Sequence, residues 1–292
     1  MPLESYRKRI DAIDKEIVSL LNERYETVRK IGAYKKSSAS AIYIPEREKL
    51  VYEKVRKLNA GPMRDVTLFA IYREIMSGAL SLEQELSIAY FGPEGGGSHF
   101  AAVAKFGDSV TYISCATVGN LLESIASGKC DYGCVPVSAL LDGGTKENLS
   151  YFAGEKVSIC AEARGHNIAS ISMSTDAGNT SRFLILGRQK PVETGRDRTS
   201  LAFLLPDRPG TLCNALLPFR DENLTLHMLG GHPAGKEEEE DCYFFMDLEG
   251  HIHSEKVQEC VKKLREVTLE VILLGSYPKG LKKIMETEKS AD

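Results

Sequence analysis

Apolar residues recur at helical spacing through the first part of the chain. Between Leu3 and Lys35 the sequence has no proline and one glycine, and isoleucine, leucine and valine return every three or four residues. The pattern predicts one helix about 50 Å long, more than a single small domain can cover, so another helix or another chain must bury its exposed length. Further helices are predicted over Pro45–Leu58 and from Met63 to about Glu85, which makes residues 1–86 all-helical.

At Ser87 the pattern changes to short β-rich segments that alternate with helical ones, which predicts an α/β lobe over residues 87–188. The polar stretch from Arg164 to Thr180 is predicted to be a connection, and residues 189–198 a linker. The predicted segments are Ile88–Phe91, Ser98–Phe106, Val110–Ile113, Val118–Ser127, Tyr132–Val137 and Arg182–Leu186.

Residues 199–280 carry strand and helix patterns in the order βαββαβ, which predicts a ferredoxin-like domain. The charged residues 281–292 are predicted to form a tail. We therefore expect a multidomain protein with a helical segment, a reduced α/β lobe and a ferredoxin-like domain. Strands are predicted over Thr199–Leu205, Leu224–Leu229, Cys242–Leu248 and Leu269–Tyr277, and helices over Thr211–Glu222 and Ser254–Thr268.

Composition narrows the functional classes. The 292 residues are 42% hydrophobic and 27% charged, which suits a globular protein of two or three domains and excludes a disordered or fibrous chain. The net charge of −4 provides no general positive field for a nucleic acid. No apolar stretch is long enough for a bilayer and the N-terminus lacks signal-peptide regions, so we expect a cytoplasmic protein without membrane contact. Seven scattered cysteines predict reduced thiols, and no metal site is expected.

Basic residues of the first helix are the first candidates for chemistry. Arg24 and Lys35 are 11 residues apart, which places them within about 20° of each other on one helical face. Arg7 lies 17 residues before Arg24 and is rotated by about 260°, so a shared role would place it in the site of a partner chain. Taken alone, such charges are more often solvated surface groups.

Four motifs change that balance. They are Arg7-x-x-Ile10-Asp11-x-x-Asp14, Leu20-Leu21-x-Glu23-Arg24, Ile31-Gly32-x-x-Lys35 and Pro45-Glu46-Arg47-Glu48. Together they resemble the all-helical family of chorismate mutases over residues 3–86. The resemblance implies an intertwined helical dimer that rearranges chorismate to prephenate by a pericyclic reaction. Such a reaction needs no cofactor and no covalent intermediate, so catalysis depends on positioning and electrostatics.

The resemblance also implies roles for individual residues. Arg24 and, from the partner chain, Arg7 would hold the two substrate carboxylates, with Arg47 in support. Lys35 would donate to the ether oxygen as negative charge develops there. Glu83 occupies the position of a second donor to that oxygen, a role in which a glutamate must be protonated.

Three more positions complete the implied pocket. Glu48 would accept a hydrogen bond from the substrate hydroxyl. Ile44 stands where the family usually has an aspartate, and Ala79 where a serine lines the pocket. Both changes remove a polar contact, which weakens affinity more than it affects the chemistry.

The α/β lobe carries Gly92-Pro93-Glu94-Gly95-Gly96-Gly97-Ser98 and Asp131-Tyr132-Gly133-x-Val135-Pro136-Val137. Both resemble prephenate dehydratase domains, and the order of segments is similar to that of the bifunctional chorismate mutase/prephenate dehydratase family. Ser181-Arg182-Phe183 stands where that family has Thr-Arg-Phe with a catalytic Thr, and Ser138-Ala139-Leu140 replaces a Glu-Asn-Ser or Glu-Asn-Thr sequence. The family's domain has two lobes around a cleft, and residues 87–188 are too few for both. We therefore expect an inactive dehydratase-like lobe.

The last domain carries Arg208-Pro209-Gly210-Thr211-Leu212 and Tyr243-Phe244-Phe245-Met246-Asp247-Leu248. These resemble ACT regulatory domains, which bind amino acids at subunit interfaces. Leu229-Gly230-Gly231-His232-Pro233 replaces the family's phenylalanine-binding Glu-Ser-Arg-Pro. The resemblance implies an amino-acid effector near Gly210, Thr211, Leu212 and His232, but the glutamate that would meet its amino group is missing.

The expected function is that of a homodimeric or larger chorismate mutase in the biosynthesis of phenylalanine and tyrosine. Two alternatives stay open. One is a full bifunctional enzyme that makes phenylpyruvate, which requires Ser181 to work without a second lobe. The other is a non-catalytic protein that binds metabolites and regulates. The set of converging charges favours an enzyme, since a scaffold has no need of Arg7, Arg24, Lys35, Arg47, Glu48 and Glu83 together.

Overall fold

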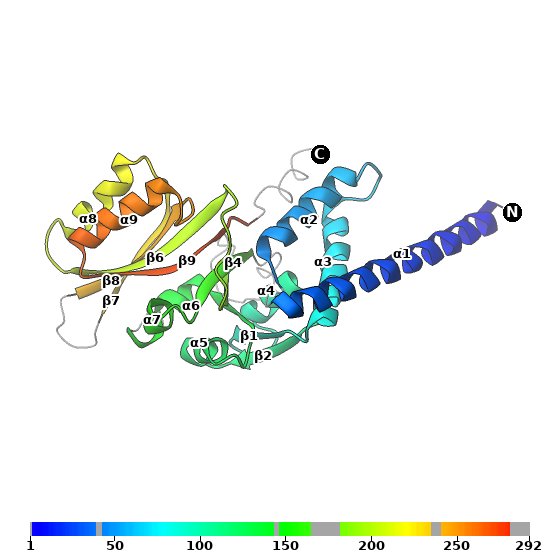
Figure 1. Ribbon diagram of the computed structural model, residues 1–292, viewed down its shortest axis with the longest axis horizontal. Coiled ribbons are helices and arrows are strands. Elements are labelled where there is room, and N and C mark those ends of the chain that lie inside the picture. Colours follow the sequence, from blue (N-terminus) through cyan, green and yellow to red (C-terminus); the bar gives the residue numbers. More distant parts are fainter. Residues whose placement is uncertain (1, 39–42, 143–145, 165–181, 235–240, 281–292) are drawn as a thin grey trace.

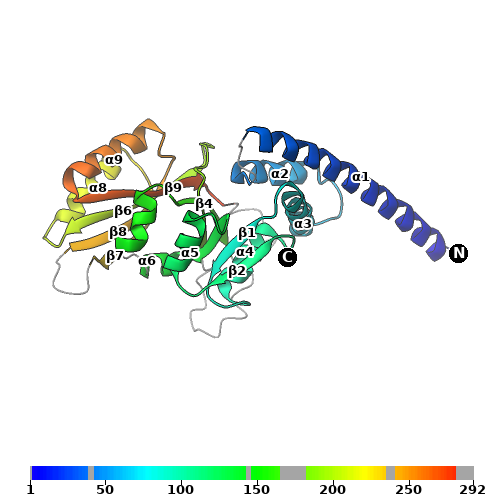
Figure 2. The ribbon, with the colours of Figure 1, turned by 60° about the horizontal axis from the view of Figure 1, so that its bottom comes forward.

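The computed structural model describes residues 2–38, 43–142, 146–164, 182–234 and 241–280. A helical segment, a five-stranded sheet lobe and a four-stranded sheet domain follow one another along the long axis (Figure 1). The turned view shows the same arrangement (Figure 2). The chain is therefore elongated, and the sheet lobe lies in its middle.

The three predicted N-terminal helices are confirmed as α1 (Pro2–Ser38), α2 (Pro45–Leu58) and α3 (Asp65–Glu83). α3 begins two residues later than predicted, because Arg64 keeps an extended backbone before the first turn. The second half of α1 packs on α3, where the Tyr25 hydroxyl donates to the Ile75 carbonyl oxygen at 3.1 Å.

The first half of α1 projects away from the rest of the molecule (Figures 1 and 2). It carries large apolar side chains that stay exposed, among them Tyr6 at 68%, Ile10 at 56% and Ile17 at 48%. No helix in the described part of the chain covers them. An apolar stripe of this length needs a partner surface, which agrees with the expectation that another chain buries it.

The sheet lobe has the strand order β2-β1-β3-β5-β4. β1 runs parallel to β2 and β3, whereas β5 runs antiparallel to β3 and β4. Buried residues of α5 pack on this sheet, and the Thr117 side chain caps that helix by accepting from the Asn120 N–H. The elements are β1 (Ser87–Phe91), α4 (Gly97–Phe106), β2 (Thr111–Cys115), α5 (Val118–Ala126), β3 (Tyr132–Pro136), α6 (Val137–Asp142), α7 (Lys146–Ala153), β4 (Ser158–Arg164) and β5 (Arg182–Gly187).

Helices α6 and α7 and strand β4 were not predicted from the sequence. The sequence of β4 contains Glu162 and two alanines, residue types that are uncommon in strands, and its place beside β5 overrides that local preference. Its last residue, Arg164, was predicted to begin a connection. The rest of that predicted connection lies outside the described residues.

The third part has the strand order β7-β8-β6-β9 with antiparallel neighbours throughout. α8 and α9 lie on one face of this sheet (Figure 1). β6 begins at Asp197, inside the predicted linker 189–198, because its carboxylate accepts the backbone N–H groups of Thr194 and Gly195. The elements are β6 (Asp197–Pro206), α8 (Thr211–Asp221), β7 (Leu226–Pro233), β8 (Asp241–Glu249), α9 (Glu255–Val267) and β9 (Glu270–Pro278).

Contacts between two strands and at the start of α2 join the parts. β4 and β9 lie edge to edge, so close that a Cβ atom at Gly275 would be 2.4 Å from the Ile159 carbonyl oxygen. At the start of α2, Gln189 donates through Nε2 to the Tyr43 carbonyl oxygen at 2.9 Å. The Val192 N–H donates to Glu46 Oε1 at 2.8 Å. The segment before β6 therefore fixes the entrance of α2.

None of the described helices is both long and apolar enough to span a bilayer. All seven cysteines are free thiols, and five of them are buried. Burial raises the pKa of Cys134 and of Cys160, so these thiols stay protonated and are poor nucleophiles.

Candidate active site

A pocket of about 140 Å³ lies where the helical segment meets the sheet lobe. α1, the beginning of α2, α3 and the end of α4 each contribute to its wall. Of the eight residues that the resemblance assigned to a mutase site, six line this pocket. They are Arg24, Ile44, Arg47, Glu48, Ala79 and Glu83.

The other two predicted residues lie on α1. Arg7 is exposed on the projecting half and does not line this pocket, which agrees with its helical angle. Lys35 lies one turn after Ile31, a pocket residue, but its side chain is outside the described part of the chain.

One donor atom of the Arg24 guanidinium is without an acceptor among the described residues. This atom, Nη1, is buried. Leaving a buried charged donor without an acceptor is costly, so such groups normally meet one. A ligand oxygen with negative charge in the pocket would satisfy this guanidinium.

Glu83 at the end of α3 lies close to α1, because the residue of α1 that faces it, Gly32, has no side chain. A Cβ atom at Gly32 would lie 3.1 Å from Glu83 Cγ, closer than nine in ten real contacts of that kind. Glycine at this position therefore allows the end of α3 to reach the pocket beside α1.

Glu48 holds two contacts on a single oxygen. The Tyr43 hydroxyl donates to Oε2 at 2.7 Å, and the Lys105 ammonium lies 2.7 Å from the same atom. Burial and the neighbouring Glu48 carboxylate raise the pKa of Tyr43 well above its ordinary value, so the phenol keeps the proton that it donates. No described residue donates to Oε1, which stays available to a ligand hydroxyl.

Several residues that line the pocket were not predicted from the sequence. On α3, Arg73, Met76 and Leu80 precede Glu83 at spacings of three or four, so a helical stripe ending at Glu83 would have shown them. Tyr43 and Lys105 carried no such signal, because Lys105 reaches the pocket only through the packing of α4 against α3.

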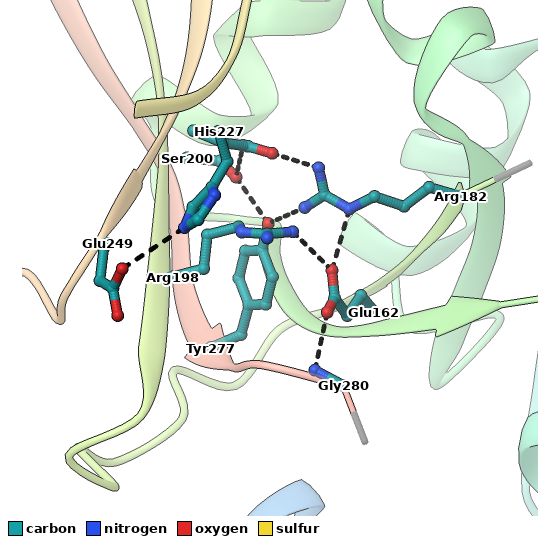
Figure 3. A network of polar contacts seen from close by, with 9 residues as sticks. Glu162, Arg182, Arg198, Ser200, His227, Glu249, Tyr277 and Gly280 are labelled. Atoms are coloured by element: carbon teal, nitrogen blue, oxygen red, sulfur yellow. Dashed lines mark hydrogen bonds and ion pairs between the residues drawn. The ribbon is translucent and has the colours of Figure 1, made fainter. Parts of the chain in front are cut away.

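Of the three dehydratase-like residues, Arg182 lies outside this pocket, where the two sheets meet. Arg182 on β5 contacts Glu162, Asp247 and Tyr277, with its Nε 2.9 Å from Glu162 Oε2 (Figure 3). Arg198 on β6 shares that oxygen at 2.8 Å. Phe183 is buried in the lobe's core, and Ser181 lies outside the described residues.

The neighbours of Arg182 leave its charge in place. Burial alone would lower its pKa, but Tyr277, Asp247 and Glu162 together raise it above the ordinary value. Burial and the adjoining Asp247 raise the pKa of Tyr277, which therefore stays protonated. Arg182 is thus a permanent cation held between two domains.

The residues predicted to bind an effector take part in the backbone turn before α8, in the core of the second sheet or in its edge strand. Gly210 has a φ of 85° directly before α8, a conformation that favours glycine, and the Thr211 hydroxyl donates to the Pro206 and Arg208 carbonyl oxygens. Leu212 packs on the core of the second sheet, and His232 lies half-buried on the edge strand β7. None of these four residues lines the pocket around Arg24.

Comparisons with known proteins agree with this arrangement. Residues 6–84 match the family model of type II chorismate mutases, and residues 88–171 match that of prephenate dehydratases. A bifunctional chorismate mutase/prephenate dehydratase of Aquifex aeolicus is 30% identical, with 96% of this chain and 98% of the relative covered. This chain belongs to the bifunctional chorismate mutase/prephenate dehydratase family. The alignment spans 357 positions, more than the whole chain contains, so that family member has residues without a counterpart here.

Solved structures with the family's dehydratase fold are more distant. Prephenate dehydratase of Arthrobacter aurescens, solved in complex with L-Phe, has a TM-score of 0.52 at 20% identity, covering 66% of this chain and 90% of its own. GqqA, described as a novel type of quorum quenching acylase, has a TM-score of 0.53 at 20% identity, covering 68% and 97%. Likeness at this level shows the fold alone, since one fold serves several functions.

Proposed function

We propose that this protein is a chorismate mutase whose active site is the pocket around Arg24. The observation that carries the proposal is the buried, unpartnered Nη1 of Arg24 in a pocket that also contains Arg47, Glu48 and Glu83. Chorismate carries two carboxylates and a hydroxyl, and these residue types can bind both kinds of group.

Each side chain then has a task in the rearrangement, in which a C–O bond breaks as a C–C bond forms within one molecule. Arg24, with Arg47 in support, binds a carboxylate and holds the substrate in its reactive shape. Lys35 and a protonated Glu83 donate to the ether oxygen, where negative charge develops. Glu48 accepts a hydrogen bond from the substrate hydroxyl through Oε1.

The exposed apolar stripe on α1 supports a homodimer, in which the projecting half of each α1 packs on the other chain. Arg7 lies on that half and would reach the pocket of the partner. The proposed organisation is a mutase domain over residues 1–86, a dehydratase-like lobe over 87–188, a linker over 189–198, an ACT-like domain over 199–280 and a tail over 281–292. The antiparallel order β7-β8-β6-β9 with two helices on one face supports the ferredoxin-like, ACT-like assignment.

Dehydratase activity is proposed to be absent. Residues 165–181, between β4 and β5, are too few to build a second lobe, since folded domains need about 50 residues or more. Arg182 belongs to Ser181-Arg182-Phe183, which stands where the family has Thr-Arg-Phe. Glu162 and Asp247 balance its charge at the contact between the two domains. Both observations support a lobe that has lost its cleft.

Kinetics on purified protein test the mutase proposal. Arg24→Ala is expected to lower kcat/KM for chorismate on the order of a hundredfold, because a charge-assisted contact to the substrate is lost. Arg29→Ala is the matched control, since Arg29 is exposed on the same helix and pairs only with Glu26 in the described contacts. Equal activity of the two variants would contradict the proposal.

A further inference from the structure

The wall of the mutase pocket is completed by a residue from another domain. Lys105 lies on α4 of the dehydratase-like lobe, and its ammonium is 2.7 Å from Glu48 Oε2 on α2. The Lys105 side chain is 19% exposed and that of Glu48 12%. By contrast, the Lys190–Glu155 pair on the surface is 58% and 72% exposed. The Lys105–Glu48 pair is therefore shielded from water, where an ion pair is screened less.

Packing between the two domains fixes the position of Lys105. Residues just after α4 donate to α3: the Asp108 N–H to Glu74 Oε2 at 3.0 Å and the Ser109 N–H to Ser77 Oγ at 3.0 Å. These bonds hold the end of α4 on the side of α3 that faces the pocket.

Aromatic packing adds a second attachment. The centre of the Tyr43 ring lies 5.1 Å from that of Phe106 and 5.2 Å from that of Tyr132, and both of these rings belong to the sheet lobe. The Lys105 ammonium is 5.8 Å from the centre of the Tyr43 ring. Tyr43 is itself 3% exposed. The lysine therefore reaches Glu48 from a rigid support and not as a mobile surface side chain.

The charge of Lys105 matters because of what the pocket is proposed to bind. Glu48 is an anion in a site for a substrate with two negative charges, and an unbalanced carboxylate would repel that substrate. Lys105 balances this charge. Because Lys105 and Tyr43 both contact Oε2, they also orient the carboxylate so that Oε1 faces a ligand.

We propose that Lys105 is a positioning residue of the mutase site, and that the dehydratase-like lobe thereby forms a working wall of that site. The inference rests on the proposed mutase function. It gives the lobe a role that does not depend on dehydratase chemistry, and it makes the mutase segment dependent on its neighbour.

Steady-state kinetics with chorismate on the full chain test this inference. Lys105→Met is expected to raise KM about tenfold or more with a smaller change in kcat, because balanced charge favours binding of substrate and transition state alike. Lys105→Arg, which keeps the charge, should recover most of the loss. Lys129→Met is the control, since Lys129 is an exposed lysine of the same lobe. An unchanged KM in Lys105→Met would overturn the inference.

A double-mutant comparison separates charge balance from simple support of the fold. In a Glu48→Gln background there is no carboxylate to balance, so adding Lys105→Met should change KM less than twofold. A full additional loss in that background would contradict the inference. Lys105→Gln replaces the methionine variant if the latter does not fold by circular dichroism. Absence of turnover by the parent chain would instead reject the mutase function itself.

Discussion

Among the proposed site residues, Lys35 has the role that is most specific to the transition state. Its ammonium is proposed to meet charge that develops on the ether oxygen as the C–O bond breaks. Lys35→Ala is expected to cost about 3–4 kcal/mol of transition-state stabilisation, or two to three orders of magnitude in kcat. The measurement is kcat for chorismate in a variant whose circular dichroism matches the parent. A folded variant with the parent's kcat would remove Lys35 from the site.

At the scale of single residues, the family resemblance assigned Arg24, Arg47, Glu48 and Glu83 to one site, and the four line one pocket. Their catalytic roles stay predictions. Lys105 escaped prediction because its position depends on how two domains pack, which no local pattern encodes.

At the scale of elements, α1 makes the sharpest prediction. Its helical angle and exposure place Arg7 away from the pocket of its own chain. Mixing inactive Arg7→Ala chains with inactive Lys35→Ala chains should restore activity, because one of two sites in a mixed dimer then has both wild-type groups. Up to about a quarter of the parent rate is expected from random exchange between chains.

The control for this experiment is each variant mixed with itself. Exchange of subunits is verified with chains of different tag mass. No recovery in mixtures that do exchange would mean that each site is built from one chain.

The helices and strands also show which elements the spacing of apolar residues can predict and which it cannot. The helices α1, α2 and α5 follow from apolar spacing, and the alternation of β1, β2 and β3 from short apolar runs. β4 was not predicted, because it contains the charged Glu162, whose burial depends on partners such as Arg182 and Arg198 from other strands. Tertiary pairing of charges thus stabilises a strand that its own residues do not favour.

At the scale of the whole molecule, the Glu162 network joins the two sheets. Glu162 also accepts the Gly280 N–H at 2.7 Å, and its side chain is 2% exposed (Figure 3). Glu162→Ala removes the carboxylate that pairs with the buried Arg198 and the partly buried Arg182, which is expected to cost about 3–5 kcal/mol. The midpoint of thermal unfolding should fall on the order of 10 °C.

Glu155→Ala is the matched control, because Glu155 pairs with Lys190 at the surface and its removal should leave the midpoint within a degree or two of the parent's, roughly the effect of an exposed ion pair. Circular dichroism on heating follows both variants. A Glu162→Ala chain that melts together with the Glu155→Ala control would show that the network does not hold the domains together.

The products formed from chorismate test the account most directly. Purified full-length chain is incubated with chorismate at neutral pH, and prephenate and phenylpyruvate are quantified against a control without enzyme. Prephenate is expected to accumulate well above the control, because six of the eight residues proposed for the mutase site line one pocket. Phenylpyruvate is expected not to exceed the control, because residues 165–181 are too few for the second lobe that the proposed dehydratase cleft would need. Chorismate loss no faster than the control would contradict the mutase assignment, and enzyme-dependent phenylpyruvate would contradict the loss of dehydratase function.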